Sequence, residues 1–246
     1  MTKVNEPKVS IIYCMFNFSR TVTHMAMASL ANIRKYTNDE DYELIIVENT
    51  AVINGEPVMH RIRDEYDVLK LDEAKHIVNE VDAGYYKSLN QGAKLATGKY
   101  LVFIQPDVFV HEGWLDGLCY YLDNDLYDVV WPDQFPRTRD FIKDSYNMSY
   151  EDATAYGGRE AGCLIITREA FDKTGGWDDR LFNEYGEAAF YMRIGDAGLR
   201  WTGTSKSMIT HITAGTRYSM WDEHPEIHMA DMNKDGKMWE KIRNGE

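Results

Sequence analysis

The chain is short of positive charge, and this shortage excludes two kinds of partner. Lysine and arginine together number 27 against 40 aspartates and glutamates, so the formal net charge is −13. Proteins that bind nucleic acid or anionic membranes normally present a basic surface, so neither partner is expected here. The sequence leaves open only a local basic patch around Arg137, Arg139 and Lys143.

Paired cysteines and long apolar runs are also missing. Cys14, Cys119 and Cys163 form an odd set without paired spacing, which is typical of buried thiols in a reducing compartment. No apolar run approaches the length of a membrane span. Residues 1–16 lead directly into a core strand and show no signal-peptide pattern. We therefore expect a cytoplasmic protein without a transmembrane segment.

Repeats, low-complexity tracts and Pro/Gly/Ser linkers are absent, and 246 residues suffice for one α/β domain. Short runs rich in β-forming residues alternate with helical patterns over the first half of the chain. We expect strands at 9–14, 44–47, 68–71, 100–104 and 129–131, and helices at 20–36, 83–96 and 112–122. This alternation predicts a parallel, doubly wound sheet.

The most informative stretch is 84–118, where a helix, a tight turn and a buried strand precede an acidic residue. Thr97-Gly98 breaks the helix, residues 100–104 read as the strand, and Asp107 follows Gln105-Pro106. Ligands of open α/β sheets bind beyond the carboxyl ends of the strands. A carboxylate there can hold a divalent metal, which can hold a diphosphate. The alternative is that Asp107 only closes a strand-end turn.

This stretch resembles the metal-binding region of the inverting, GT-A-fold glycosyltransferases of family two. In that family a helix with Asn-x-Gly leads to a strand ending in Asn/Asp-x-Asp, matched here by Asn90-Gln91-Gly92 and by residues 105–107. The first acidic or amide position is Gln105, a poor metal ligand, so Asp107 would carry the metal nearly alone from this motif. Residues 105–108 with 113–115 resemble the rhamnosyltransferase-like branch.

Two earlier segments extend the resemblance on the donor side. Residues 8–17 resemble the opening strand with its aromatic-Asn turn, which gives Asn17 a donor-side role. Residues 43–49 resemble the second strand, where Glu48 and Asn49 would meet the base or ribose of the nucleotide. Other interpretations stay open: Asn17 can belong to the cap of the next helix, Glu48 and Asn49 can terminate a strand, and Asn90 can only fix its turn.

Three later segments extend the resemblance on the acceptor side. Residues 162–171 and 175–178 resemble the acceptor segment and make Trp177 and Asp178 candidate acceptor contacts, although Trp177 can equally be a packing residue. Residues 186–198 resemble the helix that begins with the catalytic Glu-Asp pair. Glu187 falls on the second acidic position and Gly186 on the first, a departure. His211 matches a late histidine that joins the metal site, the alternative being a structural histidine.

The resemblance implies an α/β protein of GT-A fold, with a single Rossmann-like, doubly wound mixed sheet and an acceptor-side half. We expect one domain, 1–246: a nucleotide-sugar-binding half at 1–108, an acceptor and catalytic half at 109–223, and a peripheral helical tail at 224–246. The polar and aromatic segment 132–158 is predicted to be an acceptor-side loop region, since long irregular segments are usually functional or mobile.

Sugar transfer requires that the departing diphosphate be neutralised and that the acceptor hydroxyl lose a proton. Asp107 and His211 would hold Mn²⁺ or Mg²⁺ for the first task. Glu187, ionised at a helix start, would be the base for the second, with Glu184 as a competitor. The resemblance implies an inverting hexosyl- or deoxyhexosyltransferase that uses a nucleoside-diphosphate sugar and a glycan or lipid-linked glycan acceptor, in polysaccharide synthesis.

Two other functions stay open at this point. The changes at Gln105 and Gly186 allow a GT-A-fold protein that has lost catalysis and binds nucleotide or glycan. A nucleotidyltransferase is disfavoured because residues 13–20 lack its Gly-rich, basic signature. Residues 231–236 copy half of a calcium EF-hand loop, but the twelfth position is Ile242 instead of glutamate, so no calcium site is expected. An acidic and histidine cluster at 222–228 reads as an exposed tail.

Overall fold

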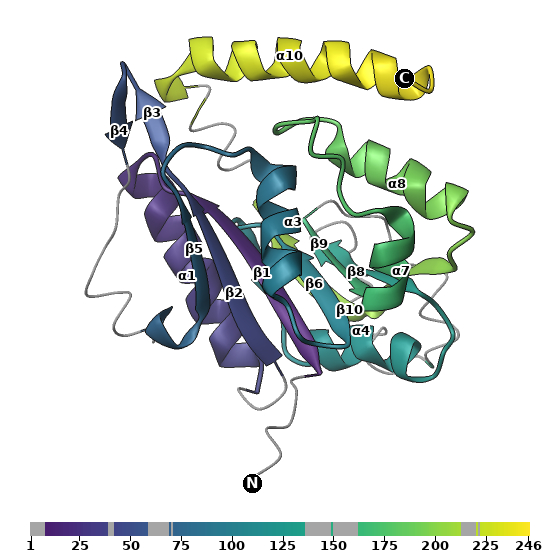
Figure 1. The fold of residues 1–246 in the computed structure, drawn as a ribbon. Helices are drawn as coiled ribbons and strands as arrows, with labels where there is room; N and C mark the ends of the chain where they lie inside the picture. The colour runs from purple at the N-terminus through teal and green to yellow at the C-terminus, as the bar shows by residue number, and fades with distance from the viewer. Residues whose placement is uncertain are drawn as a thin grey trace, which may run out of the picture.

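A central mixed sheet organises the chain, with helices on both of its faces (Figure 1). The computed structural model describes residues 8–38, 42–58, 69, 71–135, 149, 162–212, 220 and 222–246. Within these residues the sheet has eight strands in the order β5-β2-β1-β6-β9-β8-β10-β7. The strands are β1 (Val9–Phe16), β2 (Tyr42–Asn49), β5 (Lys75–Asn79), β6 (Tyr100–Ile104), β7 (Val108–Val110), β8 (Val129–Phe135), β9 (Cys163–Thr167) and β10 (Trp201–His211).

The strand directions divide the sheet into two parts. Strands β5, β2, β1 and β6 are mutually parallel, as the alternation of strands and helices predicted. Strand β9 runs antiparallel to both β6 and β8, while β10 runs parallel to β8 and antiparallel to β7. A small hairpin of β3 (Ala51–Ile53) and β4 (Glu56–Val58) stands beside the sheet. The predicted fold, a doubly wound mixed sheet of GT-A type, is confirmed.

Strand β1 lies in the middle of the parallel part, and its sequence explains why. Ile11 and Tyr13 face one side of the sheet, and Ile12 and Cys14 face the other. All four are buried. Because helices cover a parallel strand on both sides, such a strand needs apolar residues throughout.

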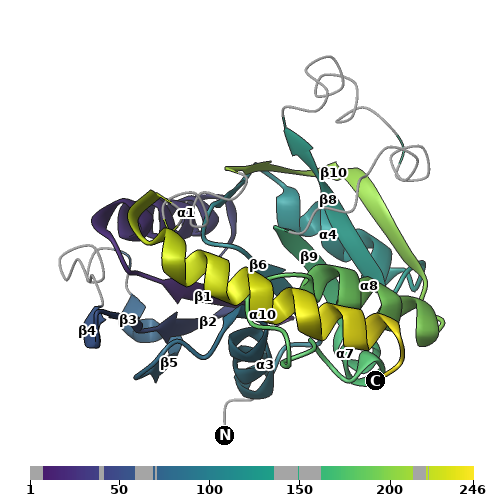
Figure 2. The ribbon, with the colours of Figure 1, turned by 90° about the horizontal axis from the view of Figure 1, so that it is seen from above.

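Helices cover both faces of the sheet. α1 (Arg20–Tyr36) and α4 (Trp114–Asp123) pack on one face, and α3 (Tyr85–Leu95), α7 (Arg168–Thr174) and α8 (Gly186–Asp196) pack on the other. The last helix, α10 (Pro225–Arg243), lies above the carboxyl ends of the parallel strands and crosses the molecule from the α1 side to the α7 side (Figures 1 and 2).

Most predicted elements of the first half are present, and one strand prediction is wrong. Helix α1 and strand β6 have the expected bounds, whereas Leu71 opens a short 3₁₀ turn (Leu71–Glu73) where a strand was expected at 68–71. The actual edge strand is β5, whose residues are exposed or half-buried. An apolar run does not predict an edge strand, because an edge strand needs few buried side chains. Leu71 is buried in the core without belonging to the sheet.

The segment 224–246, expected as a peripheral helical tail, is mostly helix α10, and residues 231–236 lie inside this helix. Its Met238, Trp239 and Ile242 pack against the core face that carries α3, α7 and α8. Residues 136–148 and 150–161, which include the basic candidates Arg137, Arg139 and Lys143, lie outside the described residues.

The cysteine and membrane expectations can be compared with the fold directly. Cys14, Cys119 and Cys163 are buried and carry free thiols, as predicted. In the part of the chain that the structure describes, no helix combines the length and apolarity needed to cross a bilayer.

Candidate active site

A pocket of about 380 Å³ opens at the carboxyl ends of β1, β2 and β6. It brings together Asp107, Glu187 and His211, which the sequence singled out as separate candidates. Five carboxylates occur in its lining: Asp82, Asp107, Glu184, Glu187 and Asp231. No lysine or arginine occurs among the lining residues that the structure describes. The pocket is therefore strongly acidic and favours a cation.

Asp107 and His211 meet because two strands pair just outside the parallel part of the sheet. β7 pairs antiparallel with β10 so that Val108 lies opposite His211, and the Ile212 N–H donates to the Asp107 carbonyl oxygen at 2.9 Å. His211 Nε2 lies 3.3 Å from Asp107 Oδ1, and both side chains are nearly buried. A Cβ atom at Gly162 would lie 2.9 Å from His211 Nδ1. Glycine at that position therefore leaves room for the imidazole beside Asp107.

This pair fits a divalent cation. His211 Nε2 is buried and lacks a hydrogen-bond partner in the structure, although it faces the Asp107 carboxylate. An imidazole nitrogen beside a carboxylate oxygen is a suitable pair of donors for a divalent transition-metal ion. Among the described residues no group of three or more His, Cys, Asp or Glu side chains gathers to hold a metal.

Glu187 enters the pocket from the first turn of α8 and is held by a tyrosine. Tyr86 donates its hydroxyl hydrogen to Glu187 Oε2 at 2.6 Å, and Gln105 Nε2 lies 3.5 Å from Oε1. Burial and the nearby Glu187 charge raise the pKa of Tyr86 well above its usual value. The phenol therefore keeps its proton, and its hydrogen bond fixes the orientation of the carboxylate.

The same tyrosine explains the glycine that replaces the first acidic residue of the family pattern. A Cβ atom at Gly186 would lie 2.2 Å from Tyr86 Cζ, inside the volume of the ring. The Tyr86 side chain is fully buried and packs against Tyr85 and Trp177. The phenol ring therefore occupies the space that a side chain at 186 would need.

The nucleotide candidates are placed differently from one another. Asn49 lines the pocket, but its side chain is hydrogen-bonded to Asn79, Ser88 and the Ala83 N–H. Glu48 is buried at the end of β2 with its Oε2 3.4 Å from His76 Nε2, and it is not part of the pocket lining. Asn17 is buried one residue beyond Phe16, which lines the pocket. The donor contacts of all three stay predictions.

Asn90 acts on the protein's own backbone. Its amide group donates to the Trp177 carbonyl oxygen at 2.9 Å and accepts from the Trp177 N–H at 3.0 Å. Asn90 lies inside α3 and binds the backbone of a residue 87 positions away instead of its own turn, and its donor contact stays a prediction. Asn90 lines no part of the acidic pocket and borders a second hollow between α3 and α7 instead.

The two acceptor candidates lie on that same second hollow. Trp177 is 4% exposed and stacks between Tyr86 and Phe190, whose ring centroid is 4.1 Å away. Asp178 is ion-paired with Arg180 at 2.8 Å and Arg193 at 2.7 Å. Burial opposes ionisation of Asp178, but these arginines outweigh it and lower its pKa. The geometry gives both residues packing or ion-pairing partners, and an acceptor contact stays a prediction.

Sequence reasoning missed part of the pocket wall. Asp82 lies between β5 and α3, and burial raises its pKa to about 6. Asn183 and Asp231 face the pocket from the loop before α8 and from α10, with Asn183 Nδ2 3.3 Å from Asp231 Oδ2. The nearest sequence signal was the acidic and histidine cluster at 222–228, whose His228 also lines the pocket.

Two solved structures have folds similar to this one. One is GalNAc-T7 with UDP, GalNAc and Mn²⁺, with a TM-score of 0.65 and 17% sequence identity over 85% of this chain and 44% of that chain. Another is the mannosyltransferase PcManGT from Pyrobaculum calidifontis in complex with GDP-Man and Mn²⁺, with a TM-score of 0.63 and 16% identity over 89% of this chain and 60% of that chain. The chain thus spans about half the length of these neighbours, and at this identity the likeness shows the fold.

A search of curated proteins gave no match. The family model of glycosyl transferase family 2 matches residues 10–211, a range that contains Asp107, Glu187 and His211. Since this match covers most of the 246 residues, the chain belongs to glycosyl transferase family 2.

Proposed function

We propose that the protein transfers a sugar from a nucleoside-diphosphate sugar to an acceptor hydroxyl, with inversion at the anomeric carbon. The observation that carries the proposal is the convergence of Asp107, His211 and Glu187 in one pocket of a family 2 chain. The first two residues suit a cation and the third suits a base, and sugar transfer needs both.

The charge of the pocket supports a metal-dependent donor. A diphosphate carries negative charge, and the described lining offers five carboxylates and no lysine or arginine to receive it. Asp107 and His211 would hold the divalent cation, which supplies the positive charge that the diphosphate leaving group needs. Both similar structures hold Mn²⁺ together with UDP or GDP-Man.

Glu187 is the proposed base. Tyr86 donates to its Oε2 at 2.6 Å, and Gln105 Nε2 lies 3.5 Å from its Oε1. We assign the Glu187 carboxylate to accept the proton of the acceptor hydroxyl. The acceptor oxygen then attacks the anomeric carbon while the nucleoside diphosphate departs on the opposite side, and this single displacement inverts the anomeric centre.

The finer assignments come from the resemblance in sequence. We propose a deoxyhexosyl or hexosyl donor and a glycan or lipid-linked glycan acceptor in surface polysaccharide synthesis, reached from the cytoplasm. A second function, nucleotide or glycan binding without catalysis, is favoured by one observation: Gly186 stands where the family pattern has its first acidic residue.

A calorimetric and turnover panel separates these two functions. UDP-, GDP- and dTDP-sugars are tested with Mn²⁺, Mg²⁺ or EDTA on wild type, on Asp107→Asn, and on Asp116→Asn as a matched control. Asp116 is exposed on α4 and does not line the pocket. We expect metal-dependent binding and hydrolysis or transfer of one donor class, lost only in Asp107→Asn. Binding without turnover would favour the binding protein, and no binding of any donor by folded wild type would refute the proposal.

A further inference from the structure

The C-terminal helix α10 lies outside the range that the family model matches, yet it forms part of the pocket wall. The match ends at residue 211, and α10 spans Pro225–Arg243. Ile227, His228 and Asp231 of this helix line the acidic pocket. We propose that α10 is a working part of the active site, in which buried Asp235 is a positioning residue that holds the loop before α8 and, through it, Glu187. The inference rests on the proposed function for the role of Glu187 as base.

Asp235 binds three consecutive backbone N–H groups. Its Oδ1 accepts from Phe182 at 2.8 Å, and its Oδ2 accepts from Asn183 at 2.7 Å and from Glu184 at 2.8 Å. The side chain is fully buried, so these are hydrogen bonds to an ionisable group shielded from water, which are stronger than those between neutral groups. The backbone of 182–184 is therefore fixed to α10 and cannot shift independently of it.

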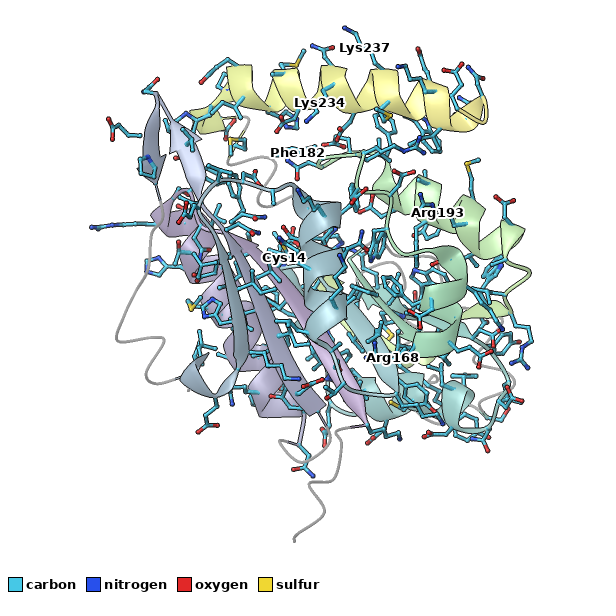
Figure 3. All side chains as sticks on the ribbon, in the orientation of Figure 1. Cys14, Arg168, Phe182, Arg193, Lys234 and Lys237 are labelled. Atoms are coloured by element: carbon cyan, nitrogen blue, oxygen red, sulfur yellow. The ribbon has the colours of Figure 1, made fainter. Side chains whose placement is uncertain are left out.

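Two ring contacts join the same loop to the same helix. Lys234 places its Nζ 4.6 Å from the centroid of the Phe182 ring, beneath α10 (Figure 3). Tyr185 stacks on Trp239 with centroids 5.9 Å apart and planes 5° apart. Together with Asp235, they place contacts from two successive turns of α10 on residues 182–185.

The backbone of Tyr185 shows why this support is needed. Its φ is 62°, in the left-handed region that residues other than glycine rarely adopt. Such a residue keeps its conformation only when its surroundings impose it. Tyr185 immediately precedes Gly186 and Glu187, so the conformation at 185 sets the direction in which α8 begins and Glu187 points.

The loop also reaches the tyrosine that orients Glu187. The Phe182 carbonyl oxygen accepts from the Tyr85 N–H at 2.8 Å, and Asn183 Oδ1 lies 3.2 Å from the same nitrogen. Tyr86 is the next residue of α3 and donates to Glu187. A displacement of 182–184 would therefore disturb Glu187 twice, through its own backbone and through its hydrogen-bond donor.

Asp235→Asn tests this arrangement with a side chain of equal size. An amide replaces one carboxylate oxygen by an NH₂ group, which places a donor against a backbone N–H donor and removes at least one of the three hydrogen bonds. Glu240→Gln is the matched control, since it makes the same chemical change at an exposed position of α10. Both variants are compared with wild type by hydrogen exchange of the amides at 182–187, by donor binding, and by kcat and KM.

For Asp235→Asn we expect exchange at 182–184 to become at least about tenfold faster and kcat to fall by about ten- to a hundredfold, because small misplacements of a catalytic group have effects of this size. The Kd for the donor should stay within about twofold, since Asp107 and His211 are not attached to this loop. Glu240→Gln should match wild type in every measurement. Unchanged hydrogen exchange would refute the proposal that Asp235 holds the loop 182–184. Faster exchange with unchanged kcat would refute its positioning role for Glu187.

A second variant keeps the inference testable if Asp235→Asn does not fold. Trp239→Ala removes the stacking partner of Tyr185 from a half-buried position, and Trp239→Phe should restore the contact and the rate. A kcat equal to wild type in Trp239→Ala would overturn the positioning role of α10. Hydrogen exchange needs no turnover. If wild type used no donor, the proposed function would fail, while exchange at 182–184 would still test whether Asp235 holds this loop.

Discussion

Gly186→Ala is the sharpest perturbation of the proposed catalytic centre, because one added methyl group would meet the tyrosine ring that holds the base. The new Cβ would lie 2.2 Å from Tyr86 Cζ and 2.3 Å from Cε1 and Cε2. Carbon atoms in contact normally stay ~3.5–4.0 Å apart, so ring and helix must separate by over ~1 Å. Tyr86 has no free side to move into, since Trp177 and Tyr85 lie against it with ring centroids 5.8 and 5.4 Å away.

The cost can be bounded from known overpacking effects. Forcing extra carbon into a packed core destabilises by roughly 1–3 kcal/mol. Alanine regains up to about 1 kcal/mol over glycine inside a helix, and less at the first residue of α8, where Gly186 lies. We therefore expect a net loss of roughly 1–2 kcal/mol, which in a domain of this size lowers Tm by about 2–8 °C. Transfer should fall at least about tenfold, because the Tyr86 hydroxyl leaves its position 2.6 Å from Glu187.

The same helix offers the control. Gly195 also lies in α8, but a Cβ atom there would have nothing within 4 Å. Gly195→Ala should therefore keep or raise Tm and leave transfer unchanged. Differential scanning calorimetry of both variants is repeated in a Tyr86→Ala background, where Gly186→Ala should cost almost nothing. An equal loss in both backgrounds, or no loss in either, would show that the Tyr86 ring is not what opposes a side chain at position 186.

Three further predictions follow from the same geometry. Glu187→Gln should keep the donor Kd within about twofold by calorimetry and lower transfer by roughly 10²–10⁴-fold, and transfer near the wild-type rate would exclude Glu187 as the base. Asn90→Ala should destabilise by about 1–3 kcal/mol in urea unfolding without changing donor affinity, because it leaves the Trp177 N–H and carbonyl without their side-chain partners. The folded pKa of Asp82 is about 6 against 3.8 for the free side chain, so folded protein holds more protons between these values and stability falls as pH rises from about 4 to about 6. Asp82→Asn should remove this slope from urea midpoints measured over that range, and an unchanged slope would assign it to another group.

The parallel half of the fold was predictable because its signals are local. The buried strand β6 is a run of five apolar or aromatic residues followed by Gln105-Pro106, and α1 begins just after Ser19, whose side chain accepts from the Val22 N–H. The edge strand β5 lacks such a signal, since an edge pairs on one side only and its residues are half-exposed. Its pairing with β2 depends on tertiary position, which periodicity does not encode.

The candidate site was predictable as a set of residues but not as a network. Asp107, Glu187 and His211 could be found by their order along the chain, and all three line the pocket. The hydrogen bond between Tyr86 and Glu187 joins residues 101 positions apart, and no pattern around Tyr86 distinguishes it from a packing aromatic. For Trp177 the sequence left two roles open, an acceptor contact and packing; its ring is enclosed by other aromatics, and the acceptor contact stays a prediction.

Gly186 stands where the family pattern has an acidic residue, and replacement of that side chain by the Tyr86 ring explains the glycine better than simple loss of the acid. If the family position had simply lost its acid, the space beside Glu187 would be open, and a methyl group there would be tolerated. Instead the Tyr86 ring fills that space and donates a hydrogen bond to the carboxylate that remains. Glycine at 186 and tyrosine at 86 therefore require each other. A site decaying without selection has no physical reason to retain such a fit, and this favours catalysis over a degenerate binding protein. Replacing Tyr86 by phenylalanine should therefore leave the packing and Tm nearly unchanged, yet lower the rate of transfer.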